Sequence, residues 1–260
     1  MEANRLKGRV ALITGASRGI GDAIARGYAQ EGATIAVTAR SEADLQRLVE
    51  EVQRAGGTAV AIPADLAESS APAYVIRKVL ESFGTIDILV NNAGVGSSDG
   101  PSPVVTFDDA FWYKTLNLNL TVPYLLTKAS LPVMLKKKWG RIINIASING
   151  KLPALHGAAY AASKHGLLGL TRTLALEVAR DGITVNAICP GPVHTLLNDR
   201  RIEYDAKRLG LTFAEVESRM TPIGRRLEPE EIVPIAVLLA LDESAAITGQ
   251  ALNVCGGVAT

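Results

Sequence analysis

Short apolar runs alternate along the chain with longer segments of helical period. Seven of these runs are rich in Val, Ile and Leu and have the length of strands: 10–13, 34–37, 59–62, 86–90, 141–145, 183–188 and 251–254. Because such strands are apolar at nearly every position, they predict a parallel sheet covered by helices on both faces. We therefore expect an α/β protein with one doubly wound sheet of about seven strands.

The segment 41–57 shows how clearly one of the intervening helices is marked. Ser41 and Asp44 have the spacing of a capping box at its start, and Gly56 supplies a stop at its end. Between these signals, four apolar residues fall on one helical face: Leu45, Leu48, Val49 and Val52. The pattern predicts an amphipathic helix lying on the sheet.

No internal repeat, low-complexity tract or linker divides the chain, so we expect one domain over residues 1–260. The least regular segments are 94–106 and 190–226, and each follows a predicted strand. Ligands of an open parallel sheet bind beyond the carboxyl ends of its strands. These two segments are therefore expected to set substrate specificity, with 190–226 acting as a substrate loop or lid.

Composition narrows the classes of partner. Of 260 residues, 27 are Lys or Arg and 26 are Asp or Glu, so the net charge of +1 gives no general attraction to nucleic acid or to an anionic membrane. The chain lacks the apolar runs of a secretory signal or a membrane span. Cys189 and Cys255 lie far apart in apolar segments, and the three histidines are isolated. We expect a cytoplasmic protein without a metal site.

The first predicted strand runs directly into the sequence TGASRGIG at 14–21. Glycines at 15, 19 and 21 let the backbone turn sharply and approach a ligand closely. The helix expected to start near Gly19 would point free N–H groups at an anion. A tight turn alone would also use glycine, but the strand before it and the helix after it favour a site for a nucleotide diphosphate.

The end of the second strand indicates which dinucleotide binds. A domain that selects NAD places a carboxylate there for the ribose 2′-hydroxyl, whereas this chain has Thr38-Ala39-Arg40. Arg40 and Arg18 are suited to a 2′-phosphate, because guanidinium groups bind phosphate in bidentate fashion. We therefore expect NADP(H) in preference to NAD(H), the alternative being that both arginines are solvated surface residues. Asp65, after the third strand, is expected to bind the adenine amino group or to cap the next turn.

Five motifs in order make the chain similar to the short-chain dehydrogenase/reductase family over essentially its whole length. They are TGASRGIG (14–21), Asn91-Asn92-Ala93-Gly94, Ser147, the Tyr160–Lys164 pair and Pro190-Gly191. The resemblance is nearest to bacterial 3-oxoacyl-thioester and polyketide ketoreductases. It implies a Rossmann-type fold and the transfer of a hydride between a nicotinamide cofactor and a C=O or CH–OH group.

The resemblance also assigns roles to residues. It implies that Tyr160 is the general acid and base, that Ser147 binds the substrate oxygen and that Lys164 assists Tyr160. It implies a fourth catalytic residue, Asn119, for which Asn117 is the alternative. The cofactor contacts implied are Gly15, Ser17, Arg18, Gly19, Ile20, Gly21, Arg40, Asp65, Leu66, Asn92, Ala93, Gly94, Tyr160, Lys164, Pro190, Gly191, Val193 and Thr195.

Tyr160 and Lys164 also have a direct physical connection. If 157–180 is a helix, positions 160 and 164 lie one turn apart on the same face, so the ammonium can approach the phenol. A nearby positive charge favours the phenolate, so we expect the pKa of Tyr160 to fall from its ordinary value of about 10. Such a shift would suit a group that exchanges a proton with the substrate.

These observations predict an NADPH-dependent ketoreductase acting on a 3-oxoacyl thioester or a related ketone. A dehydrogenase of a small hydroxy acid, polyol or sugar is the alternative, and a non-catalytic NADP(H)-binding sensor is a third interpretation. The resemblance implies a homotetramer built on two long helices after Thr106 and Gly157. Docking of an acyl carrier protein stays open, because Lys136-Lys137-Lys138 favours it whereas the acidic residue in Arg180-Asp181 opposes it.

Overall fold

The computed structural model describes residues 4–259, in which the seven predicted strands form one parallel sheet. The chain moves outward from β1 to β3, returns to the other side of β1, and moves outward again from β4 to β7. The expected doubly wound α/β fold is thus confirmed. The strands are β1 (Val10–Thr14), β2 (Thr34–Thr38), β3 (Ala59–Ala61), β4 (Ile88–Asn91), β5 (Gly140–Ile145), β6 (Ile183–Pro190) and β7 (Ala251–Val254).

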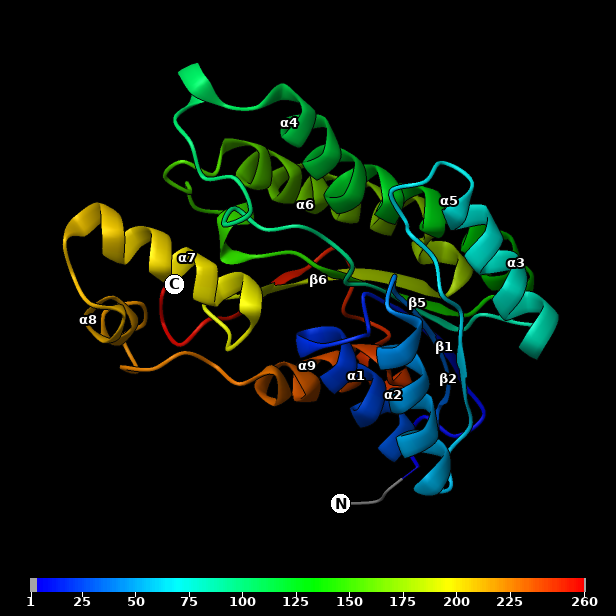
Figure 1. The fold of residues 1–260 in the computed structure, drawn as a ribbon. Helices are drawn as coiled ribbons and strands as arrows, with labels where there is room; N and C mark the ends of the chain where they lie inside the picture. Colours follow the sequence, from blue (N-terminus) through cyan, green and yellow to red (C-terminus); the bar gives the residue numbers. More distant parts are fainter. Residues whose placement is uncertain (1–3, 260) are drawn as a thin grey trace.

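Helices cover both faces of this sheet (Figure 1). One face carries α3, α5 and α6, with α4 packed on α6, and the other carries α1, α2 and α9. The helices α7 and α8 project beyond the sheet on the side where β6 ends. The helices are α1 (Gly19–Gln30), α2 (Glu42–Arg54), α3 (Ala71–Phe83), α4 (Asp109–Leu116), α5 (Val122–Lys137), α6 (Ala158–Val178), α7 (Leu196–Leu209), α8 (Phe213–Ser218) and α9 (Val233–Ala240).

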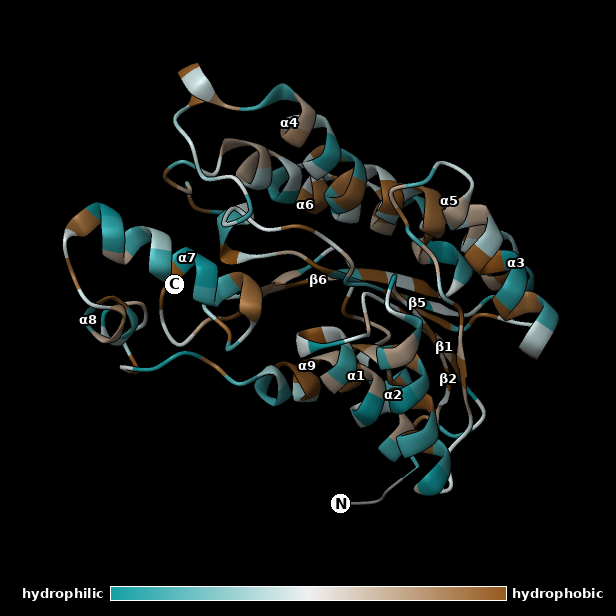
Figure 2. Ribbon diagram, viewed as in Figure 1, coloured by the Kyte–Doolittle hydropathy of each residue, from teal (hydrophilic) through white to brown (hydrophobic). Residues whose placement is uncertain are grey.

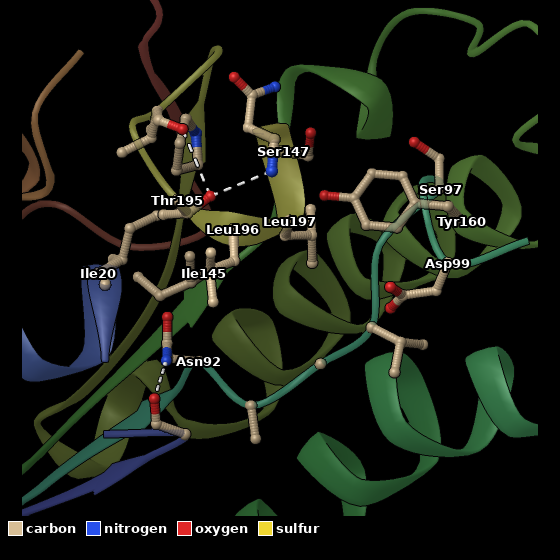
Figure 3. Close-up of a pocket in the computed structure, with 18 of the residues that line it drawn as sticks. Ile20, Asn92, Ser97, Asp99, Ile145, Ser147, Tyr160, Thr195, Leu196 and Leu197 are labelled. Carbon is tan, nitrogen blue, oxygen red and sulfur yellow. Dashed lines mark hydrogen bonds between the residues drawn. The ribbon is translucent and has the colours of Figure 1, made fainter. Parts of the chain in front are cut away.

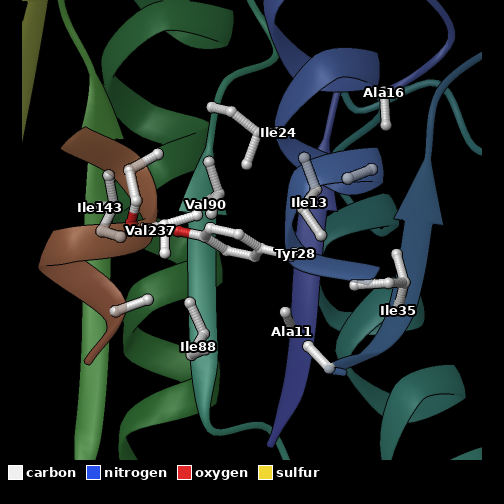
Figure 4. Close-up of a cluster of buried hydrophobic side chains, with 14 of the residues drawn as sticks. Ala11, Ile13, Ala16, Ile24, Tyr28, Ile35, Ile88, Val90, Ile143 and Val237 are labelled. Atoms are coloured by element: carbon white, nitrogen blue, oxygen red, sulfur yellow. Dashed lines mark hydrogen bonds between the residues drawn. The ribbon is translucent and has the colours of Figure 1, made fainter. Parts of the chain in front are cut away.

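The core consists of two apolar layers, one on each side of the sheet, and the strands are correspondingly apolar along their length (Figure 2). Successive residues of a strand point to opposite faces, so Ile13 enters the layer under α1 and α9, whereas Leu12 enters the layer under α3 and α5. In the first layer Tyr28 is fully buried beside Val237 (Figure 4). Its hydroxyl donates to the Ala236 carbonyl at 2.8 Å, which joins α1 to α9.

Two strand ends differ from the prediction by two residues, and every other end lies within one residue of it. β4 begins at Ile88 rather than at 86; just before it, the Val10 N–H of β1 donates to the Asp87 carboxylate at 2.9 Å instead of to a backbone carbonyl of this segment. β6 continues to Pro190, since that residue still pairs with Val254 of β7. Both differences arise from neighbouring strands, which the local pattern does not contain.

Three further features bear on the expected class of protein. Within residues 4–259, no helix has the length and apolarity that crossing a membrane requires. The same residues contain no group of three or more His, Cys, Asp or Glu side chains placed to hold a metal ion. Cys189 and Cys255 are both buried free thiols.

Candidate active site

A cavity of about 1300 Å³ lies along the carboxyl edge of the sheet (Figure 3). Its walls come from the loop after β1, from the segments that follow β2, β3, β4, β5 and β6, and from α6 and α7. It thus spans the point between β1 and β4 where the strand order reverses. An open α/β sheet binds its ligands at this position.

The loop between β1 and α1 forms one wall of the cavity. Gly15 and Gly19 have φ values of +66° and +60°, a conformation that strains any residue with a side chain. A Cβ atom on Gly15 would also lie only 2.8 Å from the Ala93 Cα. Arg18 precedes α1 without capping it through its side chain. The first N–H groups of this helix therefore suit the diphosphate of a dinucleotide.

Asn92 fastens this loop to the end of β4. Its Nδ2 donates to the Thr14 carbonyl at 2.9 Å and to the Gly15 carbonyl at 3.1 Å, and its backbone N–H donates to Thr14 Oγ1. Gly21 lies behind this side chain, because a Cβ atom there would meet Asn92 Nδ2 at 2.5 Å. Gly21 therefore permits the close packing of α1 on the loop and does not line the cavity, and its contact with the cofactor stays a prediction.

Arg18 and Arg40 line the cavity where the loop after β1 meets the end of β2. Both arginines are exposed, and neither forms a salt bridge within the described part of the chain. Asp65 and the buried Leu66 follow β3 at the same wall. The Asp65 carboxylate accepts the Ala67 N–H at 3.0 Å, so it shapes the turn as well as facing the cavity.

Tyr160 and Lys164 lie one turn apart on α6, as predicted, and both line the cavity. Lys164 is buried, and its Nζ donates to the Ile145 carbonyl at 2.8 Å. The same Nζ lies 5.8 Å from the centroid of the Tyr160 ring. One backbone acceptor at the end of β5 therefore positions the ammonium beside the phenol.

Burial governs the protonation of this pair. It raises the pKa of Tyr160, an effect that hydrogen bonding with the Ser147 hydroxyl opposes, and it lowers the pKa of Lys164 to about 8. The expectation of a lowered Tyr160 pKa is therefore wrong for this structure. The ammonium is directed at the Ile145 carbonyl, and the protein atoms packed around the half-buried phenol disfavour the phenolate. Tyr160 is held as a neutral phenol with a proton to donate.

Ser147 follows β5 and begins the short 3₁₀ turn Ile148–Gly150. Its Oγ accepts the Asn149 N–H at 3.1 Å, which fixes the side chain in a buried position. In Figure 3 the Tyr160 hydroxyl points toward Ser147. Two hydroxyl groups from different elements thus converge on one place in the cavity, where they can bind a single oxygen atom.

Asn119 lies outside the cavity, in a π-helical turn (Asn117–Thr121) that joins α4 to α5. Its Oδ1 accepts the Val95 N–H at 2.9 Å, and its Nδ2 donates to the Val95 carbonyl at 2.9 Å and to Ser163 Oγ at 3.1 Å. Ser163 in turn donates to the Tyr160 carbonyl at 2.7 Å. Asn119 therefore links the loop after β4 to the turn of α6 that carries Tyr160.

The alternative candidate, Asn117, faces a different neighbour. Its Nδ2 donates to the Ala67 carbonyl at 3.2 Å, in the segment after β3. The wider π turn separates the directions of the two asparagines, and such turns are frequent at functional sites. The local sequence does not signal the π turn. This turn nevertheless decides which of the two asparagines reaches α6.

The segment after β6 closes the cavity from the other side. Thr195 Oγ1 accepts the Asn198 N–H at 3.3 Å and so caps α7. The Thr195 methyl group lies 3.2 Å from the position of a Cβ atom on Gly19. Thr195 thus serves as the helix cap considered from the sequence and also reaches the glycine-rich loop. Pro190, Gly191 and Val193 line the approach to it.

All the residues predicted for the site, except Gly21 and Asn119, line this one cavity. The lining also includes side chains that the sequence analysis did not single out. Many of them fall in the two irregular segments 94–106 and 190–226, which was the only signal for them, and others lie outside both segments. They include Ser97, Asp99, Phe111, Leu155, Leu196, Leu197 and Met220.

A doubly wound sheet with an anion-binding loop at its switch point, and with Ser147, Tyr160 and Lys164 beside that loop, defines a class of dinucleotide-dependent oxidoreductase. Comparison with known sequences identifies the family within this class. Residues 9–205 match the sequence profile of the short chain dehydrogenases. The chain belongs to this family and is an NAD(P)-dependent oxidoreductase.

Relatives of known description cover nearly the whole chain. A protein described as a ketoacyl reductase of the granaticin polyketide synthase of Streptomyces violaceoruber is 43% identical over 254 residues, which are 96% of this chain and 92% of the relative. The D-beta-hydroxybutyrate dehydrogenase of Rhizobium meliloti is 39% identical over 96% of this chain and 98% of its own. The crystal structure of a variant of the actinorhodin polyketide ketoreductase with NADPH has 39% identity and a TM-score of 0.92, with 99% of each chain covered.

Replacing each asparagine of the π turn tests the difference between them. Asn119→Ala removes three hydrogen bonds of a fully buried side chain, so it is expected to lower the free energy of unfolding by about 2–3 kcal/mol. It is also expected to lower kcat for ketone reduction, because Tyr160 loses its link to the loop after β4. Asn117→Ala, the matched control, removes one bond and should change both quantities less. Urea unfolding and NADPH oxidation measure the effects, and equal losses in the two variants would contradict this assignment.

Proposed function

We propose that this protein reduces a ketone to a secondary alcohol with NADPH and that Tyr160 donates the proton. The observation that carries the proposal is the Tyr160 hydroxyl directed toward Ser147, with the Lys164 ammonium held behind it by the Ile145 carbonyl. A proton donor beside a developing oxyanion is the arrangement that carbonyl reduction requires. The polyketide ketoreductase relatives and the NADPH-containing structure of one of them support this direction of the reaction.

The residues divide the reaction between them. The nicotinamide cofactor supplies a hydride when it is bound. Ser147 Oγ and the Tyr160 hydroxyl donate hydrogen bonds to the ketone oxygen and orient it. Negative charge builds on this oxygen as the carbon is reduced, and the Tyr160 proton moves to it to complete the alcohol. Lys164 stabilises the phenolate that remains, and Asn119 and Ser163 keep this turn of α6 in place.

The cofactor end of the cavity supports NADP(H) over NAD(H). The glycine cradle and the N-terminus of α1 suit a diphosphate, as described above. Beside them Arg18 and Arg40 carry positive charge without a carboxylate partner in residues 4–259. A ribose 2′-phosphate would supply that partner through charge-assisted hydrogen bonds.

Two other functions remain as alternatives to ketone reduction. Oxidation of a hydroxy acid, polyol or sugar would use the same residues in reverse, with Tyr160 as the base. The D-beta-hydroxybutyrate dehydrogenase relatives give this second interpretation its support. A sensor that binds NADP(H) without turnover would need the glycine-rich loop but not the convergence of Ser147, Tyr160 and Lys164. That convergence favours an enzyme.

Tyr160→Phe is the direct test of the proposed function. The change removes only the hydroxyl, so turnover of ketones with NADPH should fall at least 1000-fold, on the order expected for a lost acid combined with a lost oxyanion donor. Binding of NADPH, followed by its fluorescence, should change little. The substrate panel contains acetoacetyl thioesters, acetoacetate esters, cyclic diketones and keto-sugars. Retained turnover in the variant would refute the role of Tyr160, and tight NADPH binding without turnover in the wild type would favour the sensor.

Arg40→Ala tests the choice of cofactor. The loss of a charged hydrogen bond to the 2′-phosphate is expected to raise the Kd for NADPH by about 10- to 100-fold while leaving the Kd for NADH nearly unchanged. Arg47→Ala on the outer side of α2, where Arg47 faces Glu51, is the matched control and should affect neither cofactor. A parallel loss of affinity for both cofactors would show that Arg40 does not read the 2′-phosphate.

We also propose a homotetramer formed through the outer faces of the two long helical segments. The segment 109–137 is helical throughout, counting its π turn, and runs beside α6. Large apolar side chains on these helices are exposed in the single chain, among them Tyr113, Tyr124 and Leu176. Sedimentation equilibrium should therefore give a mass about four times the 27.4 kDa of one chain. A mass of one chain would contradict the proposal.

The form in which the substrate arrives depends on whether the lysines at the end of α5 can receive a carrier protein. Carrier docking at Lys136-Lys137-Lys138 is weakened by the pairing of Lys137 with the buried Asp87. We favour a small ketone or a thioester over a carrier-bound substrate for this reason. A cytoplasmic location stays a prediction.

A further inference from the structure

The two ends of the cavity differ in how their charges are compensated. At the cofactor end, Arg18 and Arg40 carry positive charge without a salt-bridge partner in residues 4–259, as described above. At the other end, beside Tyr160, the arginines of α7 that line the cavity are both paired with carboxylates. Arg201 pairs with Asp205 within α7 at 2.7 Å, and Arg200 reaches across to Asp99 in the loop after β4, also at 2.7 Å.

The pair between Asp99 and Arg200 is part of a connection between two walls. One helical turn before Arg200, the Leu197 carbonyl accepts the Ser98 hydroxyl at 2.6 Å. Figure 3 shows Ser97 and Asp99 on the side of the Tyr160 ring, with Leu197 near the Tyr160 hydroxyl and Leu196 farther toward Thr195. The carboxylate of Asp99 therefore faces the space in which a substrate meets Tyr160, with Arg200 as its partner.

Resting on the ketone reduction proposed above, we propose that Asp99 is a specificity residue that excludes substrates bearing a free carboxylate. The negative charge of Asp99 repels a substrate carboxylate in this part of the cavity. Arg200, the arginine that would bind this carboxylate, is already paired with Asp99. An uncharged ketone flanked by apolar groups meets no such penalty and contacts Leu155, Leu196 and Leu197. The substrate class is therefore a neutral ketone such as an ester or thioester, in contrast to a free 3-oxo acid.

One other cation lines the cavity and enters the test. Lys114 is exposed on α4, one turn from Phe111, and Phe111 packs within 3.2 Å of the Cβ position on Gly100. Lys114 forms no salt bridge with another residue of the described chain. Arg200, in contrast, is the direct partner of Asp99, so it is the cation that the loss of the Asp99 charge would free, and we assign the effect on acids to Arg200.

Asp99→Asn tests the inference with two substrates that share the same reacting ketone, acetoacetate and methyl acetoacetate. The wild type is expected to have the higher kcat/KM for the neutral ester. The variant frees Arg200 while preserving the shape of the side chain, so the ratio of ester to acid activity should fall about fivefold, the size of one exposed ion pair. This fall in the ratio should be smaller at 0.5 M salt, because Asp99 and Arg200 are partly exposed and salt screens their charges. If Asp99→Asn only loosened the connection between the loop after β4 and α7, the activity on both substrates would change alike. The ratio of ester to acid activity would then stay the same.

Three further variants assign the effect to a residue. Asp99→Asn combined with Arg200→Gln should return the ratio to that of the wild type, whereas Asp99→Asn combined with Lys114→Gln should not. Asp109→Asn, an exposed position outside the cavity lining, makes the same charge change and should leave the ratio unaltered.

The outcomes separate the inference from the function on which it rests. An unchanged ratio in Asp99→Asn, a wild type that prefers acetoacetate, or reversal by Lys114→Gln instead of Arg200→Gln would overturn the role of Asp99 while ketone reduction stands. A wild type that reduces no ketone of the panel would overturn the proposed function, and the inference with it.

Discussion

The hydrogen bond from Lys164 to the Ile145 carbonyl holds together the parts of the molecule on which chemistry depends. A buried ammonium needs acceptors, and the end of β5 supplies one at 2.8 Å. This bond fixes the turn of α6 that carries Tyr160 against the strand that leads to Ser147. The parallel sheet makes such a bond available, because every strand presents its last carbonyl groups at the edge where the helices begin their crossovers.

The same edge gives the protein two chemically different compartments. Unpaired arginines and helix N–H groups gather near β1 and β2, which suits a phosphate-rich cofactor. Near α7, Arg200 and Arg201 are paired with carboxylates of the protein itself, and leucine side chains line the cavity beside them. The burial that raises the pKa of Tyr160 keeps it protonated, and a protonated phenol is the form that reduces a ketone.

Much of this arrangement was predictable from the sequence, because it depends on local pattern. Continuous apolar runs located the strands, glycine spacing located the loop at 14–21, and the separation of Tyr160 and Lys164 placed both on one helical face. The features that could not be predicted depend on contacts between distant segments. The π turn at Asn119, the acceptor of Lys164, the packing role of Gly21 and the pairing of Asp99 with Arg200 are all of this kind. The predicted pKa of Tyr160 was wrong for the same reason, since the sequence showed the nearby charge but not the burial.

The central claim is that the convergence of Ser147, Tyr160 and Lys164 serves hydride transfer to a ketone. The most direct measurement follows deuterium from NADPH labelled at the transferable position of the nicotinamide into the product of methyl acetoacetate reduction. We expect one deuterium atom on the new carbinol carbon, from one face of the nicotinamide only, together with a proton from solvent on the oxygen. An alcohol product without the label on that carbon would contradict the account, as would consumption of NADPH without an alcohol product.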